Sequence, residues 1–422
     1  MSSTTAGTAR RTATRRTDRM HSWLARFDTP VTTYYLLLSV TAFLVIFGLV
    51  MVWSASTVVS LQETASVSAF SILKNQLVYA GIGAVVLMGA SRIPVRVWKK
   101  LTLPLLALAL IAQMLVFTTL FGDGEGGNRA WLVLGPISGQ PSEAIKIALA
   151  LAGGLILARK QPLLHQIGHV VIPYLVPIAA VSLGLVLLGH DLGTVLVLAS
   201  VVAGCLFAAG VPLRWFVGAG AAFSAVALAY VVTSANRLSR FDVWLGRDTD
   251  AYGAAMQPTH GRYALADGGW LGLGLGASRE KWGLLAEPHN DFIFAIIGEE
   301  LGLPGTLAVL ALFGALVWGC FRLVTRTTDP FIRIAATGIM MWILVQSLIN
   351  IGAVINLLPV IGLPLPLISS GGSSLVMTMA ALGILLAFAR AEPGCAEALK
   401  ARPSALRRSL AVIPAAAARV RR

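Results

Sequence analysis

Charged residues are scarce in this chain of 422 residues, of which 12% are Asp, Glu, Lys or Arg and 56% are hydrophobic. An average soluble domain has about a quarter of its residues charged, so this composition excludes an ordinary soluble domain. Acidic residues are especially few, since 19 of them accompany 33 basic residues and leave a formal net charge of +14. The sequence therefore belongs to the membrane class of proteins.

Cysteine is equally rare, because only Cys205, Cys320 and Cys395 occur, far apart in the sequence. This spacing excludes a disulfide framework and a cysteine zinc site. The basic N-terminus leads into a long apolar stretch without a small-residue cleavage site, so we expect no cleavable signal peptide. The basic tails carry no interleaved aromatic residues and no DNA-binding motif, so no nucleic-acid partner is expected.

Long apolar stretches are abundant. About 20 helical residues cross the roughly 30 Å hydrocarbon core of a bilayer, and ten stretches approach this length. The sequence thus predicts an all-α polytopic membrane protein with about ten transmembrane helices. The eighth stretch contains Gly302 and Pro304, which predict a kink. The stretches are 33–54, 75–91, 101–120, 143–158, 170–189, 192–211, 215–233, 291–321, 334–356 and 374–390.

The distribution of Lys and Arg predicts the orientation. With the N-terminus inside, the segments on the inner side hold 24 of the 33 basic residues. The positive-inside rule therefore places the N- and C-termini in the cytoplasm and the protein in the plasma membrane. We expect residues 1–31 to form a disordered basic cytoplasmic tail, 32–391 a ten-span membrane domain, and 392–422 a second cytoplasmic tail.

Three connections are long in this topology, namely 121–142, 234–290 and 357–373, and all three fall on the outer side. Long loops are uncommon unless they are functional or disordered. The working face of the protein is therefore expected to be extracytoplasmic.

Asp291 is the strongest candidate for catalysis, because it stands where the polar outer loop meets an apolar helix. Ionisable groups in or at the edge of a bilayer are costly and are functional candidates by default. The alternative role is an N-cap. We expect its charged neighbours to shift its pKa toward that of a general base. These neighbours are Glu287, His289, Glu299 and Glu300. Lys281, Glu287 and His289 of the same stretch are also candidate substrate-binding residues.

Two further pairs are candidate substrate-binding residues. Glu143 and Lys146 are three residues apart, so they share a helical face and form either a helix cap with a self-paired charge or an ionic pair in a polar cavity. Arg129 can bind phosphate oxygens, whereas Trp131 beside it is typical of an interfacial anchor. Both interpretations of each pair remain open.

Four outer motifs complete the candidates. Arg237 and Arg240, three residues apart, form either a pyrophosphate clamp or solvated loop charge. Asp191, in GHDLGT, is explained by N-capping, and its alternative role is to bind a polar partner across the bundle. The glycine run 268–276 lacks the strand–helix–strand context of a dinucleotide site and predicts a tight loop re-entering the membrane interface. The segment PLPLISSGGSS offers either a helix cap, formed by Ser373 or Ser374, or an oxygen- or phosphate-binding turn. The candidate binding residues of this turn are Ser369, Gly371 and Gly372.

Seven motifs occur in a fixed order: GNRAW, QPSEAIK, GHDLGT, RLSR, YALADGGWLGLGLGAS, HNDFIFAIIGEELG and LPLPLISSGGSSL. Over residues 33–391 they resemble the SEDS family (shape, elongation, division and sporulation), and most of all its cell-division members from actinobacteria. The chain departs from the family pattern at Ala286, where proline is usual, with Pro288 following Glu287. Asn356 stands where glycine is common.

The resemblance implies a ten-span peptidoglycan glycosyltransferase. Its substrate would be lipid II, a disaccharide-pentapeptide on undecaprenyl pyrophosphate, polymerised at the division septum. Asp291 matches the essential aspartate of the family, Trp131 its outer-loop tryptophan, and Glu143 with Lys146 its polar pair in the fourth span. A class B penicillin-binding transpeptidase is the implied partner, together with other division proteins.

Three alternatives remain: an elongation-type polymerase, a lipid II flippase and a scaffold of the division machinery. A transporter needs polar residues through the full depth of the bilayer, whereas the charges near the spans are concentrated in its outer half, which favours an enzyme over a transporter. A divalent cation, Mg²⁺ or Mn²⁺, would help at the pyrophosphate, although no ligand cluster in the sequence requires a metal.

Overall fold

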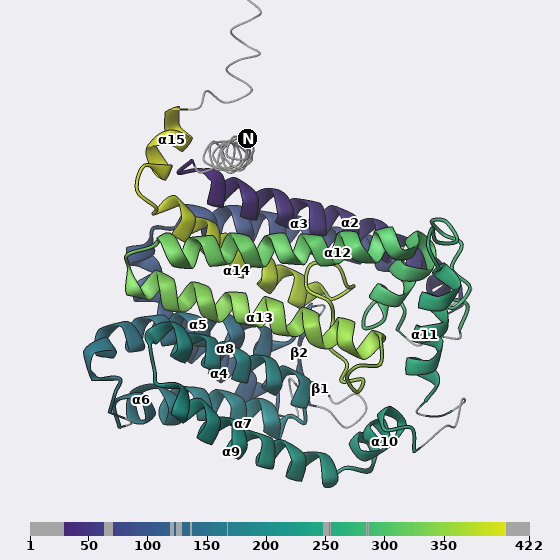
Figure 1. The fold of residues 1–422 in the computed structure, drawn as a ribbon, viewed down its shortest axis with the longest axis horizontal. Coiled ribbons are helices and arrows are strands. Elements are labelled where there is room, and N and C mark those ends of the chain that lie inside the picture. The colour runs from purple at the N-terminus through teal and green to yellow at the C-terminus, as the bar shows by residue number, and fades with distance from the viewer. Residues whose placement is uncertain are drawn as a thin grey trace, which may run out of the picture.

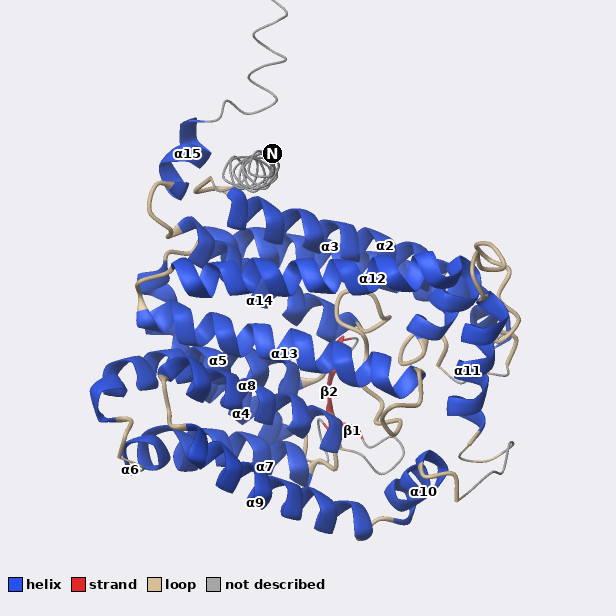
Figure 2. Cartoon of the chain, viewed as in Figure 1, coloured by secondary structure: helices blue, strands red, loops and turns tan. Residues whose placement is uncertain are grey.

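The structure, a computed structural model, is a bundle of long helices (Figure 1). Helix predominates throughout the described chain, and the strands are confined to one small sheet (Figure 2). The N-terminal tail before residue 29 and the C-terminal tail after residue 401 lie outside the described residues. The described residues are 29–62, 71–118, 122–123, 129–135, 137–166, 168–247, 253, 255–283, 285 and 287–401.

Each predicted apolar stretch contains helix. Within the described residues, nine segments are long and apolar enough to cross a membrane. The remaining helix, α4, has Arg96, Lys99 and Lys100 among its first six residues and is not among the nine. The helices are α2 (Thr32–Gln62), α3 (Ser71–Arg92), α4 (Val95–Leu115), α5 (Pro141–Lys160), α8 (Leu192–Ala209), α9 (Leu213–Val232), α12 (Ile293–Arg326), α13 (Pro330–Val354) and α14 (Gly372–Arg390). The fifth stretch consists of α6 (Gly168–Val170), the π-helical η3 (Val171–Ala180) and α7 (Val181–Leu188), after the short η2 (Gln161–Leu163).

The centre of the bundle is formed by α5, α8 and α13, which pack on one another, while α14 packs on α3 and α12 on α2. Small residues allow these helices to approach closely, as is usual between membrane helices. A Cβ atom added to Gly338 of α13 would lie 3.1 Å from the Ala150 Cβ of α5. In contrast, α9 lies at the edge with almost all of its surface exposed.

The predicted kink in α12 is confirmed. Gly302 has φ 64°, so the helix is broken there, and the glycine-rich loop lies against the break. The amides of Leu273 and Gly274 donate to the carbonyls of Glu299 and Glu300, each at 2.9 Å. These bonds satisfy carbonyl groups that the broken helix leaves free.

The long connections gather at one end of the bundle. The connection 234–290 contains α10 (Ala235–Trp244) and α11 (Met256–Gly268), which lie opposite α6 and α15 (Cys395–Ala401) in Figure 1. The connection before α5 forms an antiparallel sheet in the order β1-β2-β3, which the sequence did not predict. Its strands are β1 (Gly122–Asp123), β2 (Trp131–Leu134) and β3 (Ile137–Gly139).

Candidate active site

Asp291 lies directly before α12, where the end of the connection 234–290 is bound to the connection 357–373. Asn350 of α13 donates from Nδ2 to the carbonyl of Asp291 at 2.8 Å and to that of Leu363 at 2.7 Å. Ser369 Oγ donates to the Asn290 carbonyl at 2.7 Å. These bonds hold the backbone on either side of Asp291 against the connection between α13 and α14.

The carboxyl group of Asp291 is partly buried, and its Oδ1 has no hydrogen-bond partner among the described residues. Burial raises its pKa to about 6; the negative charge of Glu287 adds to the rise, while the guanidinium of Arg240 opposes it. The residue that caps α12 is Phe292, and no side chain forms the cap. Asp291 therefore does not have the N-cap role considered as its alternative.

Glu299 and Glu300 were expected to shift the pKa of Asp291, and this expectation is wrong. Glu299 accepts a 2.6 Å bond from the Arg279 amide. Glu300 is buried, accepts from Ser54 Oγ at 2.6 and 2.7 Å, and pairs with Lys281 at 3.0 Å. Both carboxylates thus fix the loop before Asp291 instead of facing it. Lys281, predicted to bind substrate, is buried in this ion pair.

Two cavities lie next to each other near Asp291. The smaller, of about 10 Å³, is lined by Asp291, Asn350 and Gly362 among others. The larger, of about 430 Å³, shares Val360 and Ile361 with it. In this conformation the segment that carries these two residues separates the Asp291 carboxyl group from the larger cavity.

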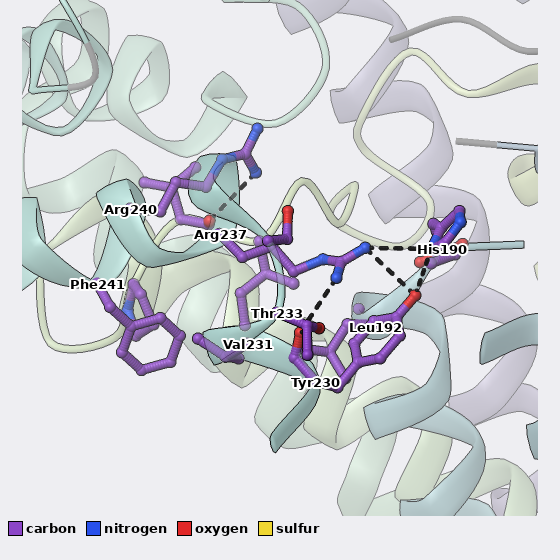
Figure 3. A pocket seen from close by; sticks show the side chains of 14 residues that line it. His190, Leu192, Tyr230, Val231, Thr233, Arg237, Arg240 and Phe241 are labelled. Carbon is purple, nitrogen blue, oxygen red and sulfur yellow. Dashed lines mark hydrogen bonds between the residues drawn. The ribbon is translucent and has the colours of Figure 1, made fainter. Parts of the chain in front are cut away.

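The larger cavity brings the two predicted arginines together, since Arg237 and Arg240 both line it from α10 (Figure 3). Arg240 Nη1 donates to the Val360 carbonyl at 3.3 Å. The Arg237 guanidinium points instead toward His190 and Tyr230, and its centre lies 4.0 Å from the Tyr230 ring centroid. The two cations therefore serve different ends of one cavity.

Glu143 and Lys146 form a buried ion pair of 2.7 Å in α5. Lys146 Nζ also donates to Gln346 Oε1 at 3.0 Å, and Gln346 Nε2 donates to the Pro364 carbonyl at 2.8 Å. Neither Glu143 nor Lys146 lines the two cavities near Asp291. The pair reaches the site through Gln346 of α13.

The remaining predicted residues are dispersed. Trp131 is half-exposed in β2, and the amide of exposed Arg129 donates to the Gly189 carbonyl at 3.0 Å, beside the larger cavity. His289 Nε2 lies 3.8 Å from an oxygen of exposed Glu287, close to Asp291. Ser369 is buried, and its hydroxyl group is bonded to the backbone. Gly371 and Gly372 start α14, where a Cβ atom on Gly372 would lie 2.5 Å from the Tyr79 ring.

Sequence reasoning missed His190, Tyr230 and Asn350. His190 is one of only six histidines and lies in a motif that was interpreted through Asp191 alone. Asp191 does cap α8, by accepting from the Thr194 amide at 2.9 Å. Tyr230 and Asn350 lie within apolar stretches, and no local pattern signals their distant partners.

Within the described chain, no group of three or more His, Cys, Asp or Glu side chains is placed to hold a metal ion. The divalent cation remains a prediction.

Comparison with known proteins supports the resemblance. The family model FTSW_RODA_SPOVE, described as cell cycle protein, matches residues 34–393. The chain is 38% identical to the probable peptidoglycan glycosyltransferase FtsW of Mycobacterium tuberculosis over 91% of this chain and 72% of that protein. It is 34% identical to the stage V sporulation protein E of Bacillus subtilis over 84% of this chain and 96% of that protein.

Solved structures agree with the sequence relatives. The structure is similar to a chain from a study of polymerization and crosslinking by a peptidoglycan synthase complex, with TM-score 0.66, 27% identity and coverage of 85% and 97%. It is also similar to the rod shape determining protein RodA of Thermus thermophilus, with TM-score 0.61, 26% identity and coverage of 85% and 96%. The chain therefore belongs to the FtsW/RodA/SpoVE family of cell cycle proteins, the SEDS family that its motifs resemble.

Proposed function

We propose that this protein is a peptidoglycan glycosyltransferase that polymerises lipid II, with Asp291 as the general base. The observation that carries the proposal is a partly buried carboxyl group of raised pKa, next to a cavity of about 430 Å³ that two arginines line. The FtsW relatives support the division-type role over the elongation-type role.

The chemistry requires one proton transfer and one leaving group. A hydroxyl group of the acceptor sugar attacks the anomeric carbon of the donor sugar, and a new glycosidic C–O bond forms. The bond from that carbon to the pyrophosphate oxygen breaks, so undecaprenyl pyrophosphate leaves with the bonding electrons. Asp291 takes the proton of the attacking hydroxyl, and the arginines of the cavity stabilise the charge on the pyrophosphate.

Substrate access requires the segment of Val360 and Ile361 to move, because it separates Asp291 from the larger cavity. Arg240 contacts this segment through the Val360 carbonyl. A phosphate group is a stronger acceptor for guanidinium than a neutral carbonyl. Binding of the pyrophosphate by Arg240 would therefore release Val360 and favour opening toward Asp291.

The location of the reaction follows from the charge distribution. Cytoplasmic termini place α10, α11 and Asp291 on the outer side of the plasma membrane. We propose that the protein acts there at the division septum. A class B penicillin-binding transpeptidase is the proposed partner that crosslinks the product. The similar chain from a peptidoglycan synthase complex supports this pairing.

Replacing Arg240 by Ala is expected to lower kcat/KM for lipid II by about 10- to 100-fold, because a charge-assisted contact is lost next to the base. Arg237→Ala should have a smaller effect, since Arg240 and not Arg237 acts on the pKa of Asp291 and contacts the segment beside it. The measurement is steady-state polymerisation by the purified variants. Arg247→Ala is the matched control, because Arg247 is a solvent-exposed arginine paired with Asp242. Equal activity of Arg240→Ala and Arg247→Ala would remove Arg240 from the site.

The pKa of Asp291 predicts the pH dependence. A general base must be deprotonated, so kcat/KM should be constant above pH 7 and fall tenfold per pH unit well below about 6. Glu287→Gln should move this acidic limb to lower pH, because it removes a negative charge that raises the pKa. A profile that is unchanged by Glu287→Gln would contradict the assignment of the limb to Asp291.

The function is tested with purified protein and lipid II. Formation of glycan strands is expected. The flippase alternative predicts instead the transfer of labelled lipid II across vesicle membranes without polymer. Transfer without any polymer, in the presence of the partner transpeptidase, would contradict the proposed activity.

A further inference from the structure

His190 stands in an unusual position at the edge of the larger cavity. Its φ of 66° lies in the left-handed region, which non-glycine residues rarely adopt. Such conformations persist where the surroundings impose them, and they cluster at ligand sites. His190 also lines the cavity, and its ring stacks on Tyr230 with centroids 6.2 Å apart.

The hydrogen bonds around Tyr230 determine which ring nitrogen of neutral His190 carries the proton. The single hydroxyl proton of Tyr230 is donated to the Leu187 carbonyl at 2.9 Å, because a carbonyl can only accept. The hydroxyl oxygen must therefore accept from its other two neighbours. These are Arg237 Nη2 at 3.2 Å and His190 Nδ1 at 2.7 Å. Arg237 Nη2 also lies 3.5 Å from His190 Nδ1, but this contact is longer than either bond to the hydroxyl oxygen, so the two bonds to Tyr230 decide the assignment.

The consequence is that the proton lies on Nδ1, and Nε2 of the neutral ring is an acceptor. No hydrogen-bond partner of Nε2 is found among the described residues. An acceptor cannot bind an unprotonated phosphate oxygen, which has no proton to give. It can bind a hydroxyl group or an amide N–H.

We propose that His190 Nε2 accepts a hydrogen bond from a hydroxyl or amide group of the saccharide-peptide head group of the lipid-linked substrate. Arg237, beside it, binds the phosphate of the same molecule. His190 is thus a specificity-determining residue that distinguishes the substrate from its leaving group, undecaprenyl pyrophosphate. This inference rests on the proposed function, because it takes lipid II as the substrate.

Two substitutions separate this role from a purely structural one. Asn tolerates the left-handed backbone, and its short amide can still donate to Tyr230, but it does not reach the position of Nε2. Gln places an acceptor near the position of Nε2. A backbone role predicts that His190→Asn behaves as the unsubstituted protein and that His190→Gln is impaired. The proposed role predicts the opposite order.

The test measures binding of lipid II and of undecaprenyl pyrophosphate to the full-length protein in nanodiscs, with Asp291→Asn present to prevent turnover. His190→Asn should weaken lipid II binding by about tenfold and leave undecaprenyl pyrophosphate binding unchanged. His190→Gln should recover most of the lipid II affinity, and Arg237→Ala should weaken binding of both ligands. With Asp291 intact, His190→Asn should raise KM more than it lowers kcat.

The inference would be overturned if His190→Asn bound lipid II as tightly as the parent, or lost affinity for both ligands equally. A thermal unfolding curve like that of the parent establishes that the variant is folded. Failure of the unsubstituted protein to bind either ligand would overturn the proposed function itself, so the two failures are distinguishable.

Discussion

Replacing Asp291 by Asn is expected to lower the rate of lipid II polymerisation by at least ~100-fold, the scale of a lost general base. Asn has nearly the same shape as Asp but cannot take a proton from the acceptor hydroxyl. The hydrogen bond from Asn350 reaches the backbone carbonyl of residue 291, not its carboxyl group, so it survives the change. The variant should therefore fold and insert normally.

The matched control for this loss is Asp242→Asn. Asp242 undergoes the same chemical change in the neighbouring helix α10, where its partner Arg247 lies 3.6 Å away at the surface. An exposed ion pair contributes only about 0–1 kcal/mol. Asp242→Asn should therefore polymerise lipid II at the parent rate, and a comparable loss in both variants would point to a general effect of charge.

Replacing Lys146 by Met is expected to cost about 3–5 kcal/mol of unfolding free energy, because the buried Glu143 carboxylate loses its cation. Activity should also fall strongly, since Lys146 orients Gln346, which holds the Pro364 carbonyl near the site. Thermal unfolding and polymerisation measured on the same preparations check both effects. Lys99→Met is the control, because its pair with Asp329 is partly exposed.

The double variant Glu143→Gln with Lys146→Met separates stability from function. It removes both buried charges, so most of the lost stability should return. We expect polymerisation to remain reduced by about tenfold or more, because Gln346 still lacks the bond from Lys146. Full recovery of activity would show that the pair serves only to neutralise charge inside the bundle.

Local patterns in the sequence were sufficient for the helices and for part of the site. Apolar runs determine where helices can cross a bilayer, and Gly302 with Pro304 marked the break in α12. The spacing of Arg237 and Arg240 placed both on one side of α10, where they line the same cavity. These features depend on neighbours within a few residues, so the sequence carries them directly.

The roles of Lys281 and Ser369 depend on residues far away in the chain, so their sequence context was misleading. Lys281 pairs with Glu300 and donates to the Ser54 carbonyl, and Ser369 donates to the Asn290 carbonyl. The cation of Lys281 appeared available for substrate in the sequence. In the fold it stabilises the loop that leads to Asp291.

The larger cavity could not be predicted for the same reason. His190 and Tyr230 are 40 residues apart and meet only because α9 returns beside the end of α7. The small sheet was missed because its strands are only two to four residues long. Elements of this length have too little periodicity to be recognised.

The central claim is that Asp291 removes the proton from the attacking hydroxyl group. The most direct test is a single-turnover measurement of glycosidic bond formation, with lipid II bound at saturation to the purified parent, to Asp291→Asn and to Asp242→Asn. We expect that all three bind lipid II, that the parent and Asp242→Asn form product at equal rates, and that Asp291→Asn is at least ~100-fold slower. Product formation by Asp291→Asn at the parent rate would contradict the role of Asp291 as the general base.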